Sequence, residues 1–527
     1  MADGTEELTQ KIKAGLERLG YSKQRATLRS TIYGNASLGT TIFHSQVNKY
    51  QERLTVVITG SHREGMAGFW QSDTDQLIIP QSVSCVEEHT KNFHDLECKT
   101  VFILDYKGAP EGYVFLKCHK IEENTPYTDI IKNDCFDKDG ELFLANNRTL
   151  ADITNIEEHT PDLFKKHEAE KGVSPDLKKP ASDKMLIKLA NEKRHGPARP
   201  FTLRIPVLGY QLAYDNVIAF KCYSLHLNQW CDSKLQARWP DVSTIDKIRK
   251  LDTYVVPIGV EGTDHESLQW RISHALAEVE LVSSFNDIQI KVYGLLKLAA
   301  KTILEKPLEQ MIENSDDVPS LSYMVKNVMF WISEEETTEG FTDELFVDRV
   351  QQAIQKLLLA METGQLPCYM FPSRNICTKK FTDEFRRKLS EELKTLLKEG
   401  ISMVKRIPEL KEHIEVTDSR KLDEKAKRRL IEEYFFLAPF TLPPEHMADV
   451  KQQFLTSKWS LQAVRIYFKE VWPYFIKNVT DDMFDDFNDR SDIRKFIHIV
   501  SEYIGLRNFF RYIKQICVTG ADPEFLY

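Results

Sequence analysis

Two residue pairs near position 60 have the types and the spacing for phosphate and metal chemistry. Gly60 and Ser61 follow an apolar run, and Asp73 and Asp75 alternate at the start of the next such run, twelve residues after the serine. Residues i and i+2 of a strand point the same way, so the two carboxylates are expected to project side by side. Adjacent carboxylates repel each other unless a cation lies between them, and hard oxygen ligands suit Mg²⁺ or Mn²⁺.

A two-metal site needs a third carboxylate, because one ion activates the attacking hydroxyl and the other neutralises the leaving group. Asp215 is the best candidate, since it is expected to open a strand over 215–222. In the Gly-Ser turn, glycine lets the backbone approach a phosphate, and backbone N–H groups with the Ser61 hydroxyl can donate to its oxygens. The residues alone leave an alternative open, a tight turn followed by acids on a solvated strand end, because Asp-x-Asp is common.

The elements that must position these residues change character along the chain. Leu8, Ile12, Leu16 and Leu19 fall on one face at helical spacing, which predicts a helix over 6–30. Short β runs bounded by Gly or Pro predict a mixed sheet. The expected strands cover residues 54–59, 75–79, 101–105, 113–118, 203–208 and 215–222.

Strand patterns fade after about residue 245, and helical patterns replace them. A charged stretch at 155–200 has the composition of an insertion. Helices are expected over 268–282, 288–304, 321–333 and 347–364. The predicted units are an N-terminal spine helix region (1–50), a core (51–245), a helical lobe (246–378) and a C-terminal helical extension (379–527). The expected fold class is α+β.

Bulk composition limits the function only loosely. The chain has 527 residues, 42% hydrophobic content and a net charge of −9, so nucleic-acid binding would need a local basic patch. Neither a signal-peptide pattern nor an apolar run of membrane-spanning length is evident, and we expect a cytoplasmic protein without membrane insertion. The nine cysteines show no zinc-ligand spacing, so no structural zinc is expected.

Several short motifs, in order along the chain, resemble those of the Mab nucleotidyltransferase-fold family, and within it the cyclic GMP-AMP synthase-like receptors. The resemblance covers about residues 50–375, and the ordered set is more specific than any one motif. The matching segments are Gly60-Ser61, Asp73-Thr74-Asp75, and residues 112–117, 195–198, 215–220, 254–257, 270–273, 321–323 and 369–372.

The resemblance implies a bilobal nucleotidyltransferase fold, with a mixed-sheet lobe, a long N-terminal spine helix, a helical lobe and a C-terminal helical extension. It implies that Asp73, Asp75 and Asp215 form a catalytic triad for two Mg²⁺ or Mn²⁺ ions, with Gly60 and Ser61 at the triphosphate. Further nucleotide contacts are implied in the helical lobe. These are Arg271, Ser273, Glu278, Lys291, Ser322 and Tyr323.

By the same resemblance, ATP and GTP, or another pair of nucleoside triphosphates, would be joined into a cyclic dinucleotide that signals to a STING-type receptor in innate immunity. The DNA-sensing vertebrate enzyme carries a zinc-binding thumb where this chain has only residues 283–286. Double-stranded RNA or an unknown ligand is therefore expected as the activator. A basic face along the first helix and a neighbouring stretch could contact it. This face comprises Lys11, Arg18, Lys23, Arg25, Arg29, Lys247, Arg249 and Lys250.

Other interpretations stay open at this point. Arg271 could form a structural salt bridge, Tyr323 could be a core aromatic and Lys291 a solvated charge. The basic face could be a solvated charged surface. The protein could be a catalytically silent Mab-fold binding or scaffold protein, although retention of the three acids and the serine argues against that. It could also be a nucleotidyltransferase that extends RNA or makes linear products, since such an enzyme has the same site.

Overall fold

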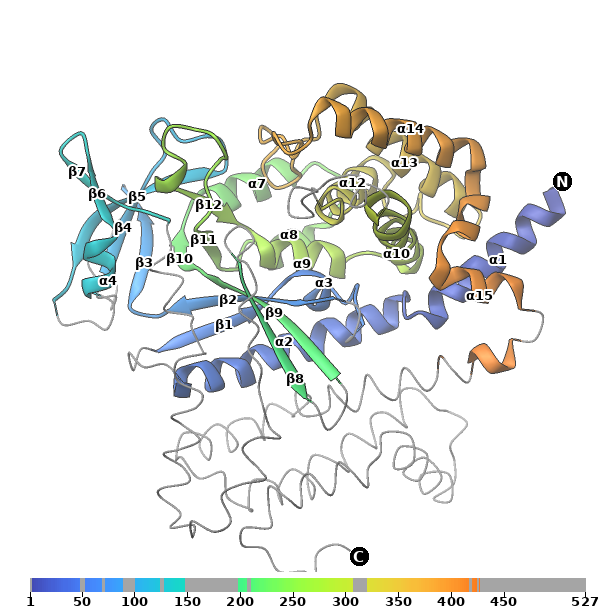
Figure 1. Cartoon of the computed structure of the whole chain (residues 1–527), viewed down its shortest axis with the longest axis horizontal. Helices are drawn as coiled ribbons and strands as arrows, with labels where there is room; N and C mark the ends of the chain where they lie inside the picture. The colour runs from blue at the N-terminus through green and yellow to red at the C-terminus, as the bar shows by residue number, and fades with distance from the viewer. Residues whose placement is uncertain are drawn as a thin grey trace, which may run out of the picture.

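The structure is a computed structural model that describes most of the chain up to residue 426 (Figure 1). The described residues are 2–47, 53–68, 72–88, 100–123, 128–146, 198–205, 210–306, 320–416, 419–423 and 426. The predicted insertion at 155–200 lies outside them except for its last three residues, and so does most of the predicted 379–527 extension. The described part mixes α and β elements, as expected. None of its helices is long and apolar enough to span a membrane.

The predicted helix over 6–30 is two helices, α1 (Ala2–Arg18) and α2 (Lys23–Val47), which Figure 1 shows in blue, with α2 beneath β1 and α1 beside α15. Gly20 ends the first helix in a left-handed conformation, with φ of 94°. The Arg29 guanidinium donates from Nη1 to the Gly20 carbonyl at 3.0 Å and holds the break. The single-helix prediction was wrong because the periodicity of the leucines does not show where the backbone reverses.

A four-stranded sheet carries the candidate acids. It consists, in spatial order, of β1 (Leu54–Ile58), β2 (Thr74–Pro80), β9 (Tyr210–Ile218) and β8 (Arg199–Ile205), with β2 and β9 parallel. Helix α2 covers the edge of β1 that faces away from β2. The Ser37 hydroxyl accepts a hydrogen bond from the Ile58 N–H at 3.0 Å, and the Thr41 hydroxyl accepts one from the Val56 N–H at 2.8 Å. Polar hydroxyls on α2 thus complete the edge of this sheet.

A second sheet closes into a six-stranded barrel through pairing of β12 with β5. Phe102, Phe220 and Trp270 are buried together, with the Phe220 and Trp270 ring centroids 5.2 Å apart. A hairpin, β6 (Cys135–Lys138) and β7 (Glu141–Leu144), extends it. The barrel strands are β3 (Val83–Glu87), β4 (Thr100–Asp105), β5 (Tyr113–Ile121), β10 (Phe220–Tyr223), β11 (Thr253–Val256) and β12 (Gln269–Ser273).

The prediction differs from the structure in three places. The expected helix over 268–282 begins as strand β12 and becomes helical only in α9 (Ala275–Ser283). Strand β11 lies in a region where no strand was expected. The expected strand over 215–222 is divided between β9 and β10, so Asp215 lies inside β9 and does not open a strand. The predicted mixed sheet is accordingly two sheets.

Helices fill the part of the described molecule opposite the barrel hairpin in Figure 1. The helical predictions for 288–304, 321–333 and 347–364 are confirmed within a few residues. The elements are α10 (Asp287–Ala299), the π-helix η4 (Ala300–Glu305), α12 (Ser322–Glu336), α13 (Phe346–Thr363) and α14 (Asp383–Glu399). Smaller elements are α3 (Gly60–Arg63), α4 (Thr128–Asn133), α7 (His226–Lys234), α8 (Val242–Ile248), η3 (Glu266–Leu268), η6 (Gly400–Arg406) and α15 (Pro408–Glu415).

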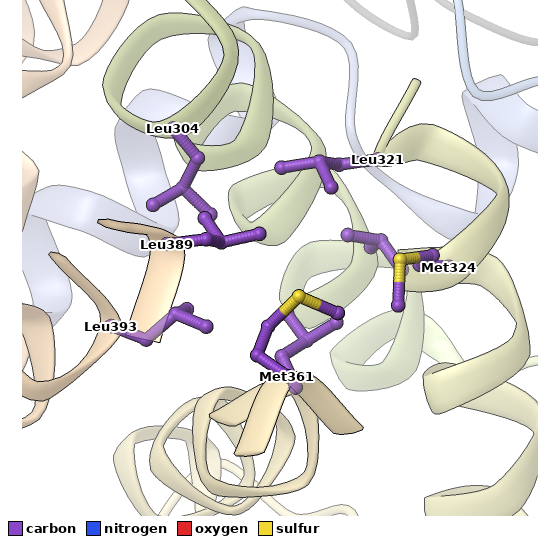
Figure 2. A pocket seen from close by; sticks show the side chains of 8 residues that line it. Leu304, Leu321, Met324, Met361, Leu389 and Leu393 are labelled. Atoms are coloured by element: carbon purple, nitrogen blue, oxygen red, sulfur yellow. The ribbon is translucent and has the colours of Figure 1, made fainter. Parts of the chain in front are cut away.

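The core of this helical part contains a small apolar cavity, shown in Figure 2. Leucine and methionine side chains line it, among them Leu321 and Met324 at the start of α12, Met361 of α13 and Leu389 of α14. Its free volume is about 10 Å³, which is room for no more than one water molecule. The cavity is therefore a packing gap between helices and not a nucleotide site.

Candidate active site

The register of two parallel strands sets the second and third predicted acids side by side. Asp75 of β2 is paired directly with Asp215 of β9. Cross-strand partners project to the same side of a sheet, so both carboxylates leave the same face. Asp73 precedes β2 by one residue, is exposed, and accepts a hydrogen bond from Ser72 at 2.9 Å. The structure therefore brings the three predicted acids to one end of the four-stranded sheet.

The pKa of Asp75 reflects the closeness of the three acids. Burial, followed by the charges of Asp73 and Asp215, raises the pKa of the Asp75 carboxyl to about 7. Among the described residues, no hydrogen bond is donated to this carboxylate. A carboxyl in this situation retains its proton near neutral pH until a cation offsets the repulsion.

Gly60 packs against Asp75 so closely that no side chain fits between them. Its φ is 66°, in the left-handed region, and a Cβ added there would lie 1.8 Å from Asp75 Oδ2. Both the backbone conformation and the contact therefore require glycine. The Thr59 N–H also donates to the Asp75 carbonyl at 2.9 Å, so the Gly-Ser turn is fixed to the strand that carries the acid.

Residues on either side of the turn anchor it. His62 is buried, with Nδ1 3.1 Å from the Thr74 hydroxyl and Nε2 3.1 Å from the Gly68 carbonyl. Tyr33 of α2 stacks on the His62 ring at 4.7 Å between centroids. The first helical region thus supports the turn directly.

The Ser61 hydroxyl accepts a hydrogen bond from the Lys297 ammonium at 2.6 Å. Lys297 lies on α10, and burial lowers its pKa to about 8, although nearby Glu64 opposes that shift. The predicted lysine, Lys291, is not brought to this turn. It forms an ion pair with Asp287 and lies 3.8 Å from Glu17 of α1. The basic group beside Ser61 is therefore Lys297, six residues further along the same helix.

A buried polar network joins the turn to the helical part of the fold. Lys326 of α12 lies 2.8 Å from Glu64, which follows α3, and 2.6 Å from Glu278 of α9. The Tyr323 hydroxyl donates to Glu278 at 3.0 Å and accepts from Arg374 at 3.1 Å. Both carboxylate oxygens of Glu278 are thus bonded within the protein. The Tyr323 hydroxyl is held between Glu278 and Arg374.

Arg271 and Ser273 lie on the outer wall of the barrel. Ser273 is paired with Tyr254, whose side chain belongs to one apolar cluster with Leu77. Leu77 shares a face of β2 with Asp75, since the two are separated by one residue. The barrel wall that carries Arg271 and Ser273 therefore faces the side of β2 from which Asp75 projects. Ser322 is the partly exposed first residue of α12.

The carboxylate triad fits a hard divalent cation in its chemistry. Mg²⁺ and Mn²⁺ prefer carboxylate oxygens, and a cation would relieve the repulsion at Asp75. Within the described part of the chain, no three His, Cys, Asp or Glu side chains are already arranged around one metal position. Side-chain rotation at Asp73, Asp75 or Asp215 would be needed to complete such a site.

The predicted basic face is not a continuous surface. Arg29 is buried at 4% exposure and donates to the carbonyls of Gly20 and Gly65, so it belongs to the interior. Arg18 donates to Asp423 at 2.7 Å. The remaining predicted residues differ in exposure and pairing. Lys11 pairs with Glu7 and Arg249 with Asp232, Arg25 is half-buried, Lys23 binds the Ser283 carbonyl, and Lys247 and Lys250 are exposed.

Lys23 and Lys247 are the members that the fold brings near each other. Burial, and then the charge of Lys247, lower the pKa of Lys23. These two residues come from α2 and α8, which are distant in the sequence. What is left of the predicted face is therefore a smaller basic patch at the start of α2 and the end of α8.

Sequence reasoning missed three residues that the structure places around the turn: Glu64, Lys297 and Lys326. The spacing along the chain held some information about two of them, because Glu64 is three residues beyond Ser61 and Lys326 is three beyond Tyr323, one helical turn in each case. No local pattern shows that these two side chains meet.

A search against protein-family models finds no match to this chain.

Proposed function

We propose that this protein is a metal-dependent nucleotidyltransferase with a bilobal fold. The observation that supports this most is the strand register that sets Asp75 beside Asp215, with Gly60 packed on the Asp75 carboxylate. The Ser61 hydroxyl and the Lys297 ammonium lie next to these acids and suit a triphosphate. The closed six-stranded barrel is not typical of such enzymes and would be a particular feature of this chain.

The residues have separate roles in this proposal. Asp73, Asp75 and Asp215 would hold Mg²⁺ or Mn²⁺, which when bound supplies charge neutralisation and an acidified hydroxyl. The Gly-Ser turn would let its backbone N–H groups and the Ser61 hydroxyl donate to phosphate oxygens. Lys297 would leave Ser61 for the negative charge of the triphosphate, which would offset the burial that lowers its pKa.

The product we propose is a cyclic dinucleotide made from ATP and GTP or another pair of nucleoside triphosphates. A ribose hydroxyl of one nucleotide would attack the α-phosphate of the other, pyrophosphate would leave, and a second attack would close the ring. Arg271 and Ser273 on the barrel wall and Tyr323 at the helical side would hold the bases and phosphates. The fold would accelerate both steps by alignment and by electrostatic stabilisation.

The biological setting we propose is a cytoplasmic innate immune sensor whose product binds a STING-type receptor. Double-stranded RNA is the proposed activator. The basic patch that contains Lys23 and Lys247 lies beside residues 283–286, where α9 meets α10, because Lys23 bonds to the Ser283 carbonyl and its backbone N–H donates to Asp287. Phosphate contacts there would reach α10, the helix that carries Lys297.

The deciding experiment uses purified protein with radiolabelled ATP, GTP, CTP and UTP and with Mg²⁺ or Mn²⁺. Duplex RNA or DNA is added in parallel, and the control is the Asp73→Asn/Asp75→Asn double variant. A phosphatase-resistant product that disappears in the double variant supports the cyclase. A phosphatase-sensitive ladder would indicate a linear polymerase, for which the same carboxylates serve.

The second candidate is a catalytically silent binding or scaffold protein. The observation that favours it is that no three potential ligands in the described chain are already arranged for a metal. This candidate predicts that neither Mn²⁺ nor a triphosphate changes the melting temperature. The enzyme proposal predicts that both together raise it and that Asp75→Asn abolishes the increase.

A further inference from the structure

Lys326 is the only described residue whose ammonium joins the Gly-Ser turn region to α9. It is 9% exposed and contacts Glu64 at 2.8 Å and Glu278 at 2.6 Å. Glu64 is 3% exposed and is also within 3.4 Å of the Tyr293 hydroxyl on α10. One side chain therefore ties together three parts of the chain that are distant in sequence.

The charges of this cluster make Lys326 indispensable to it. Burial opposes the ammonium charge, but Glu278 and Glu64 raise the pKa of Lys326 well above its usual value. Without this cation, two buried carboxylates would face each other, and ionised groups in that situation are strongly destabilising. The same two carboxylates border the functional groups, because Glu64 is three residues beyond Ser61 and Glu278 accepts from Tyr323.

We propose that Lys326 is a positioning residue of the active site. By binding Glu64 and Glu278 at once, it holds the Ser61 turn and the Tyr323 ring at a fixed separation. This inference rests on the proposed nucleotidyltransferase function. It also changes the role of Glu278, which acts through Lys326 and Tyr323 and not as a direct nucleotide contact.

The test separates loss of the link from loss of folding. Lys326→Met alone leaves two unpaired acids, so the main variant is Lys326→Met/Glu64→Gln/Glu278→Gln, which removes the link and all three charges. We expect kcat to fall at least tenfold with a melting temperature close to wild type. The single variant Lys326→Arg keeps a cation at this position and should retain most of the wild-type kcat. The matched control is Lys356→Met/Glu335→Gln, a surface ion pair of 2.5 Å in the same helical region, which should leave kcat unchanged.

Hydrogen exchange gives a readout that does not depend on activity. Peptides covering residues 58–68 should exchange at least several-fold faster in the triple variant than in wild type, and peptides from the barrel should not change. Wild-type exchange in that segment together with wild-type kcat would overturn the positioning role. If wild-type protein makes no product, the proposed function fails, while the exchange comparison still decides whether Lys326 holds the turn.

A second, independent observation concerns two thiols. Cys118 of β5 and Cys135 of β6 are half-buried, and their sulfur atoms lie 3.1 Å apart. A disulfide needs about 2 Å, so a small movement of the β6–β7 hairpin would suffice. The hydrogen bond from Cys118 lowers the pKa of Cys135, which makes Cys135 the more readily ionised sulfur.

We infer that this thiol pair is a peroxide-sensitive oxidation site. The Cys135 thiolate would attack one peroxide oxygen, giving a sulfenic acid and releasing hydroxide, which takes up a proton to become water. The Cys118 sulfur would then attack the Cys135 sulfur, forming the disulfide and expelling the second water. Two electrons pass from the thiols to one peroxide, and the S–S bond closes the hairpin onto β5.

The test is peptide mapping of the folded, full-length chain after a hydrogen peroxide titration. We expect a linked 118–135 peptide pair, reversed by dithiothreitol, at peroxide concentrations about tenfold below those that oxidise Cys377. Cys377 is a suitable comparison because it is half-buried and its sulfur donates to the Ala360 carbonyl and not to a second thiol of the described chain. Accumulation of sulfinic acid at Cys135 with Cys118 still alkylatable would refute the pair, and Cys118→Ser should give that outcome.

Discussion

Asp75 is the residue whose charge is most strongly affected by its surroundings in the candidate site. Its carboxyl has a pKa raised to about 7 by burial and by the charges of Asp73 and Asp215. In the unfolded chain the group ionises near 3.8. The folded protein therefore binds the proton more tightly, and the unfolding free energy falls as pH rises from about 4 to 7.

Replacing Asp75 by Asn should raise the stability of the metal-free protein above pH 7, by about 1–3 kcal/mol, because no charge then has to be buried. The pH dependence between about 4 and 7 should flatten in parallel. Urea unfolding at pH 5 and pH 8, with and without Mn²⁺, measures both effects. Wild-type protein should gain stability from Mn²⁺ at pH 8, whereas an Asn variant that gains as much would show that Asp75 binds no metal.

Gly60 makes a second prediction at the same scale. Gly60→Ala places a Cβ against Asp75 and strains a positive φ, so nucleotidyl transfer should fall more than about a hundredfold and stability by about 2 kcal/mol. Gly108→Ala is a matched control, because Gly108 has φ of 75° and nothing within 4 Å of an added Cβ. Equal losses of activity in the two variants would mean that the contact with Asp75 is irrelevant.

Short-range patterns were sufficient to predict the acids, because alternation and turn chemistry are encoded locally. Asp73 and Asp75 could be picked out from types and spacing, and the structure sets them near Asp215. Lys297 could not, because α10 carries two lysines and the sequence does not state which helical face meets the turn. Lys291 and Lys297 differ by six residues, and tertiary packing alone distinguishes them.

At the scale of elements, the joint between α1 and α2 supports the Gly-Ser turn. Arg29 connects the Gly20 and Gly65 carbonyls, and Gly65 lies so close to α2 that an added Cβ would be 2.0 Å from the Ala26 carbonyl oxygen. A buried guanidinium that satisfies two carbonyls is costly to remove. The break between the helices therefore belongs to the architecture of the proposed active site.

Arg29→Met should destabilise the protein by about 2–4 kcal/mol and lower nucleotidyl transfer, because both carbonyls lose their donor. Lys11→Met on the same helical pair should do neither, since Lys11 is partly exposed and forms a surface ion pair with Glu7. Thermal unfolding and initial rates measure the two effects. An Arg29 variant that melts like wild type and loses only duplex binding would restore the predicted role of Arg29 as a phosphate contact.

The elements also show where sequence patterns stop being informative. Strands β10, β11 and β12 have only four or five residues each, and β12 leads after one residue into α9, so its apolar residues fit a helical pattern as well as a strand. Closure of the barrel depends on β5 pairing with β12, which are far apart in the chain. Long α10, α12 and α13 were predictable because their periodicity extends over several turns.

At the scale of the whole molecule, a net charge of −9 means that a duplex would be attracted only locally. If the patch around Lys23 and Lys247 binds duplex RNA, Lys247→Glu/Lys250→Glu should weaken binding and reduce the slope of log affinity against log salt by about 2. Fluorescence anisotropy at several salt concentrations measures this. Lys120→Glu on the barrel is the control, because Lys120 is exposed on β5; an equal loss there would indicate nonspecific attraction.

The shared face of β2 has a consequence for how this protein can evolve. Asp75 and Leu77 project from the same side of one strand, and Leu77 packs with Tyr254 of the barrel. A substitution that enlarges or shrinks that contact shifts the strand that carries the acid, so it can persist only with a compensating change across the interface. Positions 77, 79, 254 and 256 should therefore diverge together in lineages that retain activity, and drift independently in lineages that have lost it.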